Sequence, residues 1–132
     1  MSDNKIVRAR DVMSKNVPTI DGMATASDAA NLMRKEQIAA LLVEKRDADD
    51  AWGIIVVQDL IKGVIIPDRS STEVNVYEIM TKPVITVHAD MDVRYVARLI
   101  YRAGIRRAPV EENGKIVGMI SLQSLVLDNE LF

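Results

Sequence analysis

Gly118-Met119-Ile120-Ser121-Leu122-Gln123-Ser124-Leu125 is the stretch that decides the fold, because it repeats an earlier part of the chain. Its counterpart, 65 positions earlier, is Gly53-Ile54-Ile55-Val56-Val57-Gln58-Asp59-Leu60. Each stretch starts with a glycine, continues as an aliphatic run typical of a buried strand, and turns polar where a helix can begin. Chance rarely preserves a glycine and a hydrophobic pattern together, so we interpret the two stretches as parts of a repeated unit.

The repeat extends through most of the chain. When the sequence is shifted by 67 positions, Asp11–Glu44 aligns with Glu78–Glu111 without a gap, and nine of the 34 positions are identical. The identical pairs are Met13/Met80, Lys15/Lys82, Val17/Val84, Thr19/Thr86, Ala30/Ala97, Leu32/Leu99, Ile38/Ile105, Val43/Val110 and Glu44/Glu111. We place repeat 1 at residues 8–66, a linker at 67–74 and repeat 2 at 75–128.

Both repeats predict the same order of elements, which is strand, helix, strand, strand, helix. In repeat 1 we expect them at Val17–Ile20, after Thr25, at Ala40–Glu44, at Trp52–Val56 and at Gln58–Lys62, the last ending before Gly63. In repeat 2 we expect them at Val84–Val87, after Asp92, at Ala108–Glu111, at Lys115–Ile120 and at Leu122–Leu127.

Several local patterns mark the ends of these elements. Thr25 and Asp28 are spaced as in a capping box, and Asp92 can cap the equivalent helix of repeat 2. Gly104 suits the left-handed residue that ends a helix, whereas repeat 1 has the less favourable Gln37 there. Asn113-Gly114 is a strong signal for a two-residue hairpin.

The composition excludes several classes of protein. The 132 residues carry a formal net charge of −2 and no cysteine. Disulfides, zinc thiolate sites and cysteine nucleophiles are therefore excluded, and a reducing cytoplasm is the expected location. The longest apolar runs are far too short to cross a membrane, so we expect no membrane association.

One repeat is too small to enclose much of a core by itself. We therefore expect a mixed α/β (α+β) fold in which the sheets of the two repeats pack face to face with pseudo-twofold symmetry. That arrangement predicts two related clefts, one on each side of the symmetry axis.

The ordered motifs resemble the CBS domain pair, often called a Bateman module. The first motif occurs in both repeats, as Asp11-Val12-Met13 and Glu78-Ile79-Met80, and precedes a proline-flanked strand. The second is Ile105-Arg106-Arg107-Ala108-Pro109-Val110 in repeat 2. The glycine stretches at Gly53 and Gly118 follow as the third motif. The resemblance implies a regulatory module that requires no cofactor and binds AMP, ADP, ATP or S-adenosylmethionine. It also implies a flat, disk-like homodimer that controls another protein, whose identity the sequence does not give.

Carried over residue by residue, the resemblance gives two unequal pockets. The first keeps Asp59 as the ribose anchor, beside Val57, but has Val56 where the family has a hydroxyl. Its partners from repeat 2 are Thr86, Met91, Ile105, Arg106 and Arg107. Because two arginines can hold phosphates in bidentate fashion, this pocket suits a phosphorylated adenosine.

The second pocket keeps Ser121 but has Ser124 in place of the aspartate. Its partners from repeat 1 are Thr19, Ala24, Ile38, Ala39 and Ala40. No basic residue comes from that side, so we expect a less charged ligand, weaker binding or no ligand there.

Each of these residues also has a structural interpretation. Asp59 and Ser121 can cap the short helices that begin beside them, and one of the two arginines can be simply solvated. Thr19 and Thr86 can be ordinary strand residues. If both pockets have lost function, the chain is instead a ligand-free module for protein–protein interaction, an alternative that Val56 and Ser124 favour.

The sequence argues against catalysis and against metal binding. With no cysteine and with His88 as the one histidine, most catalytic triads are absent, and no phosphate-binding glycine motif occurs. We interpret His88 as a surface residue. Arg94, Arg98 and Arg102 form a stripe that we interpret as a solvated face, with a dimer contact, an acidic partner or nucleic acid as the alternatives. The negative net charge disfavours nucleic acid.

Overall fold

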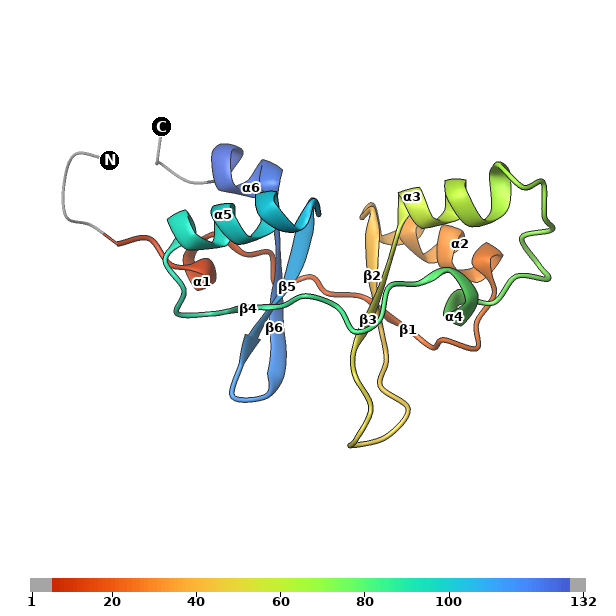
Figure 1. Ribbon diagram of the computed structural model, residues 1–132, viewed down its shortest axis with the longest axis horizontal. Helices are drawn as coiled ribbons and strands as arrows, with labels where there is room; N and C mark the ends of the chain where they lie inside the picture. The colour runs from red at the N-terminus through yellow and green to blue at the C-terminus, as the bar shows by residue number, and fades with distance from the viewer. Residues whose placement is uncertain (1–5, 129–132) are drawn as a thin grey trace. The chain divides into compact units, whose positions relative to one another are not determined.

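The computed structural model describes residues 6–128, which form two compact units (Figure 1). Unit 1 contains the described residues 6–17 and 85–128, and unit 2 contains Pro18–Val84. Each unit has one three-stranded sheet and several helices, so the expected mixed α+β fold is confirmed. The face-to-face packing of the sheets stays a prediction.

Unit 2 is continuous in sequence. Its elements are β1 (Thr19–Ile20), α2 (Ala26–Glu36), β2 (Ala40–Val43), β3 (Gly53–Val56), α3 (Val57–Leu60), the π-helix η1 (Ile61–Ile65) and α4 (Val76–Ile79). β1 runs parallel to β2, and β2 runs antiparallel to β3. The register places Val43 opposite Gly53 at one end of the sheet and Ala40 opposite Val56 at the other.

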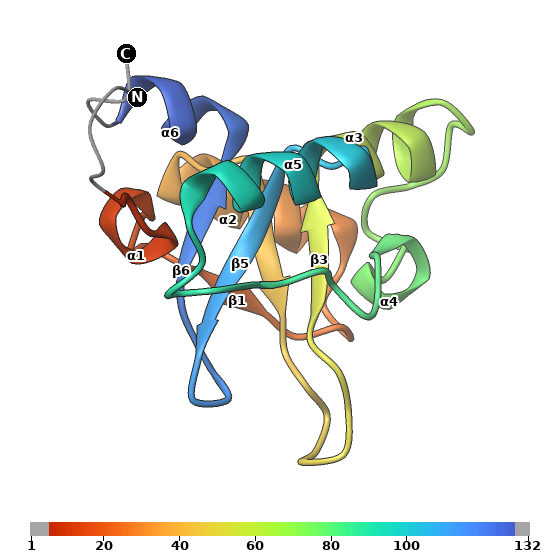
Figure 2. The ribbon, with the colours of Figure 1, turned by 60° about the vertical axis from the view of Figure 1, so that its left-hand side comes forward.

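Unit 1 repeats this plan with segments from both ends of the chain. Its elements are α1 (Ala9–Val12), β4 (Val87–His88), α5 (Val93–Ala103), β5 (Arg107–Glu112), β6 (Lys115–Ser121) and α6 (Leu122–Leu127). β4 is parallel to β5, and β5 is antiparallel to β6. Figure 2 shows that the β5–β6 hairpin turns tightly, whereas the β2–β3 connection extends well beyond its sheet.

The local signals explain where these elements begin and end. Thr25 Oγ1 accepts the Asp28 N–H and Asp28 accepts the Thr25 N–H, so the predicted capping box is confirmed. Asp92 caps α5 by accepting the Arg94 N–H at 2.9 Å. Gly104 ends α5 in the left-handed region with φ 68°, and Gln37 takes the same conformation with φ 54° at the end of α2.

Each unit buries its own aliphatic core. In unit 1 the cluster joins α1, β4, α5, β5, β6 and α6 through Ala9, Val12, Val87, Val96, Ile100, Val110, Ile120 and Leu125. In unit 2 it joins α2, the sheet and α4 through Ile20, Ala29, Met33, Leu41, Val43, Ile55 and Val76. Among the described residues, no helix combines the length and apolar character that crossing a membrane requires.

The structure differs from the predicted elements in three ways. The first strands are shorter than predicted, with only Thr19–Ile20 and Val87–His88 paired, and the strand of repeat 2 begins at Val87 instead of Val84. The helix predicted at Gln58–Lys62 does not stop before Gly63, because α3 is followed directly by η1, which runs through Gly63. Gly63 packs closely on Ile79, where a side chain would clash. The short helices α1 and α4 were not predicted.

α1 also changes how the chain is divided. The Ala9 N–H donates to the Met91 carbonyl at 2.9 Å, and the Ser14 N–H donates to the Met119 carbonyl at 2.8 Å. The segment before Pro18 therefore belongs to the unit formed by the second half of the chain. The boundaries of the compact units therefore differ from the boundaries of the sequence repeats.

Candidate functional site

The predicted binding residues are distributed over both units. Unit 2 holds Thr19, Ala24, Ile38, Ala39, Ala40, Val57 and Asp59, and unit 1 holds Thr86, Met91, Ile105, Arg106, Arg107 and Ser121. Within each unit, several of these predicted binding residues lie close together at the junction between the third strand of the sheet and the short helix that follows it.

In unit 2 the meeting place is the end of β3. The Val57 N–H donates to the Ala39 carbonyl at 3.0 Å, and Ala40 lies opposite Val56 in the sheet. Asp59 follows in the first turn of α3, and its Oδ2 accepts the Val56 N–H at 2.8 Å. The capping interpretation of Asp59 is thus confirmed, which leaves its ribose role as a prediction.

Asp59 is only partly exposed, and this affects its charge. Burial raises the pKa of this carboxyl, while the hydrogen bond from Val56 and the charge of Lys62 oppose the rise. A buried carboxylate that costs free energy to ionise gains from further hydrogen-bond donors. Ribose hydroxyls are donors of that kind.

In unit 1 the meeting place is the start of β5. Arg107 lies opposite Ser121, and the Leu122 N–H donates to the Arg106 carbonyl at 2.9 Å. Arg107 is partly buried, and burial together with the charge of Arg106 lowers its pKa. Within residues 6–128, neither guanidinium has a carboxylate at ion-pair distance. Two adjacent cations without a counter-ion favour an anion.

Ser121 has a structural role as well. Its Oγ accepts the Ser124 N–H at 3.1 Å, and the buried Ser124 Oγ donates to the Ser121 carbonyl at 2.8 Å. The N-cap interpretation of Ser121 is therefore confirmed. Ser124 occupies the place that Asp59 has in unit 2, without the charge.

The two first-strand threonines have equivalent partners. Thr19 Oγ1 donates to Glu44 at 3.2 Å, and Thr86 Oγ1 donates to Glu111 at 3.4 Å. In both units the hydroxyl thus connects the first-strand segment to the glutamate at or just after the end of the second strand. The remaining predicted residues Ala24, Ile38, Met91 and Ile105 pack partly buried against the cores of their own units.

A second feature lies at the opposite end of unit 2, and the sequence did not predict it. It is a cavity of about 390 Å³, which we call the unit 2 cavity. Its apolar wall is formed by Met23, Val43, Tyr77 and Met80. Its charged lining is formed by Asp21, Glu44, Arg46 and Lys82.

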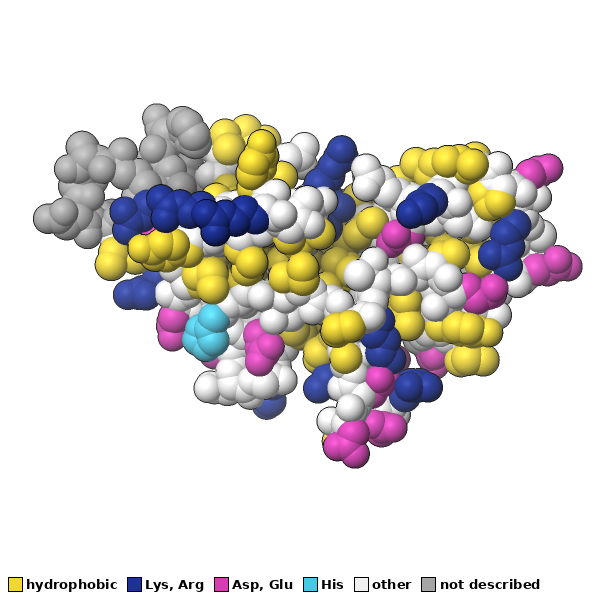
Figure 3. All heavy atoms as spheres, viewed as in Figure 1, with side chains coloured by type: hydrophobic (Ala, Val, Ile, Leu, Met, Phe, Trp, Pro, Cys, Tyr) yellow, Lys and Arg dark blue, Asp and Glu magenta, His cyan; other side chains and the backbone are white. Residues whose placement is uncertain are grey.

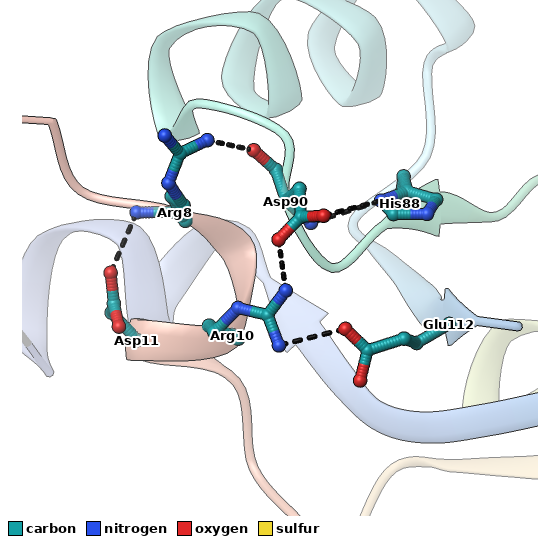
Figure 4. A network of polar contacts seen from close by, with 6 residues as sticks. All are labelled: Arg8, Arg10, Asp11, His88, Asp90 and Glu112. Atoms are coloured by element: carbon teal, nitrogen blue, oxygen red, sulfur yellow. Dashed lines mark hydrogen bonds and ion pairs between the residues drawn. The ribbon is translucent and has the colours of Figure 1, made fainter.

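The corresponding end of unit 1 holds an ion-pair network (Figure 4). Arg10 extends from α1 between two carboxylates, forming an ion pair with Asp90 and another with Glu112 at 2.8 Å. Arg8 donates to the Asp90 carbonyl at 2.7 Å, and the exposed His88 accepts the Asp90 N–H at 3.0 Å. The surface location expected for His88 is confirmed.

The fold and these strand-end sites define a class of protein built from paired α+β modules. The chain belongs to the CBS domain family, which matches residues 9–65 and 76–127. Pairs of CBS domains are in general regulatory, ligand-binding modules, and this is the class of function that the chain shares.

Individual relatives agree with this assignment. An uncharacterized protein of Methanopyrus kandleri is 34% identical over 121 residues, which cover 91% of this chain and 61% of the relative. A mitochondrial CBS domain-containing protein of Arabidopsis thaliana is 31% identical, with 88% of this chain and 61% of that protein covered. The chain thus spans about three fifths of the length of these two relatives.

Among solved structures, a hexameric CBS-CP12 protein from bloom-forming cyanobacteria is 37% identical with a TM-score of 0.90. The match covers 92% of this chain and 67% of that protein. At this level of similarity, both the fold and the family are shared.

Proposed function

We propose that the chain is a non-catalytic regulatory module of the cytoplasm that binds an adenosine-containing nucleotide and modulates a partner protein. The candidate ligands are AMP, ADP, ATP and S-adenosylmethionine. The observation that carries the proposal is the pair Arg106 and Arg107, which has no carboxylate partner within residues 6–128 although Arg107 is partly buried.

The phosphate groups are the part of the ligand that this pair recognises. Burial of the Arg107 guanidinium next to a second cation costs free energy, which the lowered pKa of Arg107 reflects. A phosphate that accepts hydrogen bonds from both guanidinium groups offsets that cost. Affinity should accordingly increase from AMP to ATP and be weakest for S-adenosylmethionine, which carries no phosphate.

Asp59 is the group that recognises the ribose. One carboxylate oxygen already accepts the Val56 N–H, and the carboxyl group can accept further donors from a ribose diol. Burial disfavours the charged form of Asp59 and raises its pKa, and hydrogen bonds donated by a ribose would oppose that effect.

Calorimetric titration of the four ligands tests the proposal. We expect Arg107→Met to weaken ATP binding about tenfold or more, because a charged hydrogen-bond partner is lost. Asp59→Asn should weaken all four ligands while keeping the cap, because an amide oxygen still accepts the Val56 N–H. Arg102→Met is the matched control, since Arg102 is an exposed arginine on α5 whose loss should leave binding unchanged.

Absence of heat with all four ligands would overturn the proposal. So would equal affinities of wild type and Arg107→Met for ATP. Binding that weakens as salt rises supports the role of the arginines, because partly exposed ion pairs are screened.

A second candidate function, assembly into an oligomer, rests on a different observation. Val57, Ile61 and Ile65 are exposed at a spacing of four along α3 and η1, and Figure 3 shows hydrophobic side chains gathered there. The similar cyanobacterial CBS-CP12 protein is hexameric. An exposed aliphatic stripe of this kind favours contact with a second copy of the chain.

Light scattering distinguishes the second function from the first. We expect a homodimer or a larger assembly that dissociates when Ile61 and Ile65 are both changed to lysine. An oligomer combined with no thermal shift from any nucleotide would favour assembly as the function. A monomer at all concentrations would exclude it.

A further inference from the structure

The unit 2 cavity and the ion-pair network of unit 1 occupy equivalent places in the two repeats. The Tyr77 N–H donates to the Gly22 carbonyl at 2.9 Å, and the Arg10 N–H donates to the Ala89 carbonyl at 3.1 Å. Tyr77 therefore corresponds to Arg10 and Gly22 corresponds to Ala89. By the same alignment, Met23 corresponds to Asp90.

These substitutions give the equivalent places in the two units different side chains. In unit 1 the Arg10 guanidinium spans the place between Asp90 and Glu112. In unit 2 Tyr77 and Met23 form no such bridge, and their side chains are 51% and 69% exposed.

Gly22 adds to the opening. It lacks the methyl group that the fully buried Ala89 supplies in unit 1. A Cβ built on Gly22 would lie 3.6 Å from the Cβ of Tyr77 and 3.7 Å from Cγ1 of Val43, which is ordinary contact distance. Unit 2 thus omits side-chain volume that its own backbone could accommodate.

The charges around the cavity indicate what it binds. Lys82 is paired with Asp50 at 2.7 Å, and Arg46 is paired with the same carboxylate at 3.2 Å. Asp21 and Glu44, by contrast, have no cation at ion-pair distance within residues 6–128. The charges at the cavity that lack a counter-ion are therefore both negative.

We propose that the unit 2 cavity binds a small organic cation, in which an aromatic or aliphatic body carries an amidinium, guanidinium or ammonium group. The body lies against Met23, Tyr77 and Met80, and the cationic group faces Glu44 and Asp21. The volume of about 390 Å³ is in the range of small-molecule sites. Unit 1 provides an example of a guanidinium between two carboxylates at this end of the sheet, although the carboxylates of Asp90 and Glu112 come from other positions than those of Asp21 and Glu44.

This site is separate from the proposed nucleotide site. Val43 and Gly53 form the end of the sheet next to the cavity, whereas Ala40 and Val56 form the end next to Asp59. Three residue steps along a strand separate the two ends by about 10 Å. Binding at one site can therefore be abolished by variants that leave the other site intact.

The test uses three probes of the same shape and different charge. Benzamidine is the cation, benzamide the neutral analogue and benzoate the anion. We expect saturable benzamidine binding by calorimetry, with amide chemical shift changes concentrated at Gly22, Met23, Glu44 and Tyr77. Benzamide should bind about tenfold more weakly, because it is a neutral hydrogen-bond donor, whereas the donor groups of benzamidine carry a positive charge. Benzoate should not bind.

Variants locate the site. Glu44→Gln should weaken benzamidine binding about tenfold, whereas Glu111→Gln, the same change at the equivalent position of unit 1, should leave it unchanged. The double variant Met23→Asp and Tyr77→Arg builds the Arg10–Asp90 ion pair of unit 1 into unit 2 and should abolish binding. Its thermal unfolding should match that of wild type, because both positions are largely exposed.

Several results would overturn the proposal. These are benzoate binding as tightly as benzamidine, unchanged binding in the double variant, or shift changes confined to other residues. If Nα-acetyl-arginine N-methylamide bound more tightly than benzamidine, the occupant would be an arginine of a protein partner instead. Arg107→Met and Asp59→Asn should retain benzamidine binding, so failure of the nucleotide proposal is distinguishable from failure of this one.

Discussion

Units 1 and 2 share one order of strands and helices, yet they differ at both ends of their sheets. At one end unit 2 carries the charged Asp59 where unit 1 has the neutral, buried Ser124. At the other end of unit 1 Arg10 forms ion pairs with two carboxylates, whereas unit 2 has a cavity beside Tyr77. The backbone contacts that hold each unit are conserved between the copies, so side chains at the strand ends can diverge. The two copies thus keep one fold while the ends of their sheets carry different side chains.

The contact of a methionine with a glycine is shared by both units, but it is tighter in unit 1. A Cβ on Gly118 would come within 2.4 Å of Met13 Sδ and 2.9 Å of the Ser14 carbonyl oxygen. We expect Gly118→Ala to lower the free energy of unfolding by about 2 to 3 kcal/mol, because the backbone of Ser14 has to move. Urea denaturation measures this loss.

The same change in unit 2 is the control. A Cβ on Gly53 would lie 3.1 Å from Met80 Sδ and 3.2 Å from the Thr81 carbonyl oxygen, so smaller shifts relieve it. Gly53→Ala should therefore cost about 1 kcal/mol. Equal losses for the two variants would contradict the difference in packing described here.

The caps of the short helices provide the next comparison. Ser121 caps α6 with its hydroxyl, whereas Val56 at the same place before α3 has no side-chain acceptor. Ser121→Val copies the unit 2 cap into unit 1 and should cost about 1 kcal/mol. Thermal unfolding measures the loss, and a Ser121→Val variant as stable as wild type would show that the cap contributes nothing.

The ends of the long helices should show a smaller effect. Gln37 has φ 54°, a left-handed conformation that Gly104 adopts without strain in unit 1. Gln37→Gly should stabilise the chain by about 0.5 kcal/mol, reduced by loss of the hydrogen bond from Gln37 Nε2 to the Arg34 carbonyl. Chemical denaturation should show that Gly104→Gln lowers the free energy of unfolding. A loss of stability in Gln37→Gly would refute the expectation.

The smallest effect is expected at Asp59, and it depends on pH. Burial raises the pKa of Asp59 in the folded chain above the aspartate value of about 3.9 in the unfolded chain. The unfolded state therefore releases this proton at lower pH, so wild type loses stability as the pH rises through this interval. Asp59→Asn should be slightly more stable than wild type at pH 7, with the advantage disappearing below about pH 4. Stability curves at both pH values test this, and a pH-independent difference would contradict it.

The sequence predicted best the elements whose ends carry clear signals. The α6 helix begins and ends at the predicted residues Leu122 and Leu127. The capping box of α2 and the left-handed Gly104 were also predicted correctly, because caps are short-range signals that depend on adjacent residues. α1 and α4 were missed because four residues are too few for a helical hydrophobic period to appear.

The candidate sites were only partly accessible from the sequence. The family pattern singled out Asp59, Arg106 and Arg107, and the structure adds their burial and the absence of ion-pair partners within residues 6–128. The unit 2 cavity could not be predicted, because it depends on Gly22 and Tyr77, which lie far apart in sequence. The structure shows that these residues are equivalent to Ala89 and Arg10, because the same backbone hydrogen bond joins each pair.

The division of unit 1 between the two ends of the chain has a consequence for synthesis. Arg8 meets Asp90 across 82 residues, whereas unit 2 is a single continuous segment. Because the ribosome makes the chain from its N-terminus, all of unit 2 has been made before the sheet of unit 1 exists. Ala9 and Val12, both buried in the finished protein, therefore remain unpartnered until β5 and β6 have been translated.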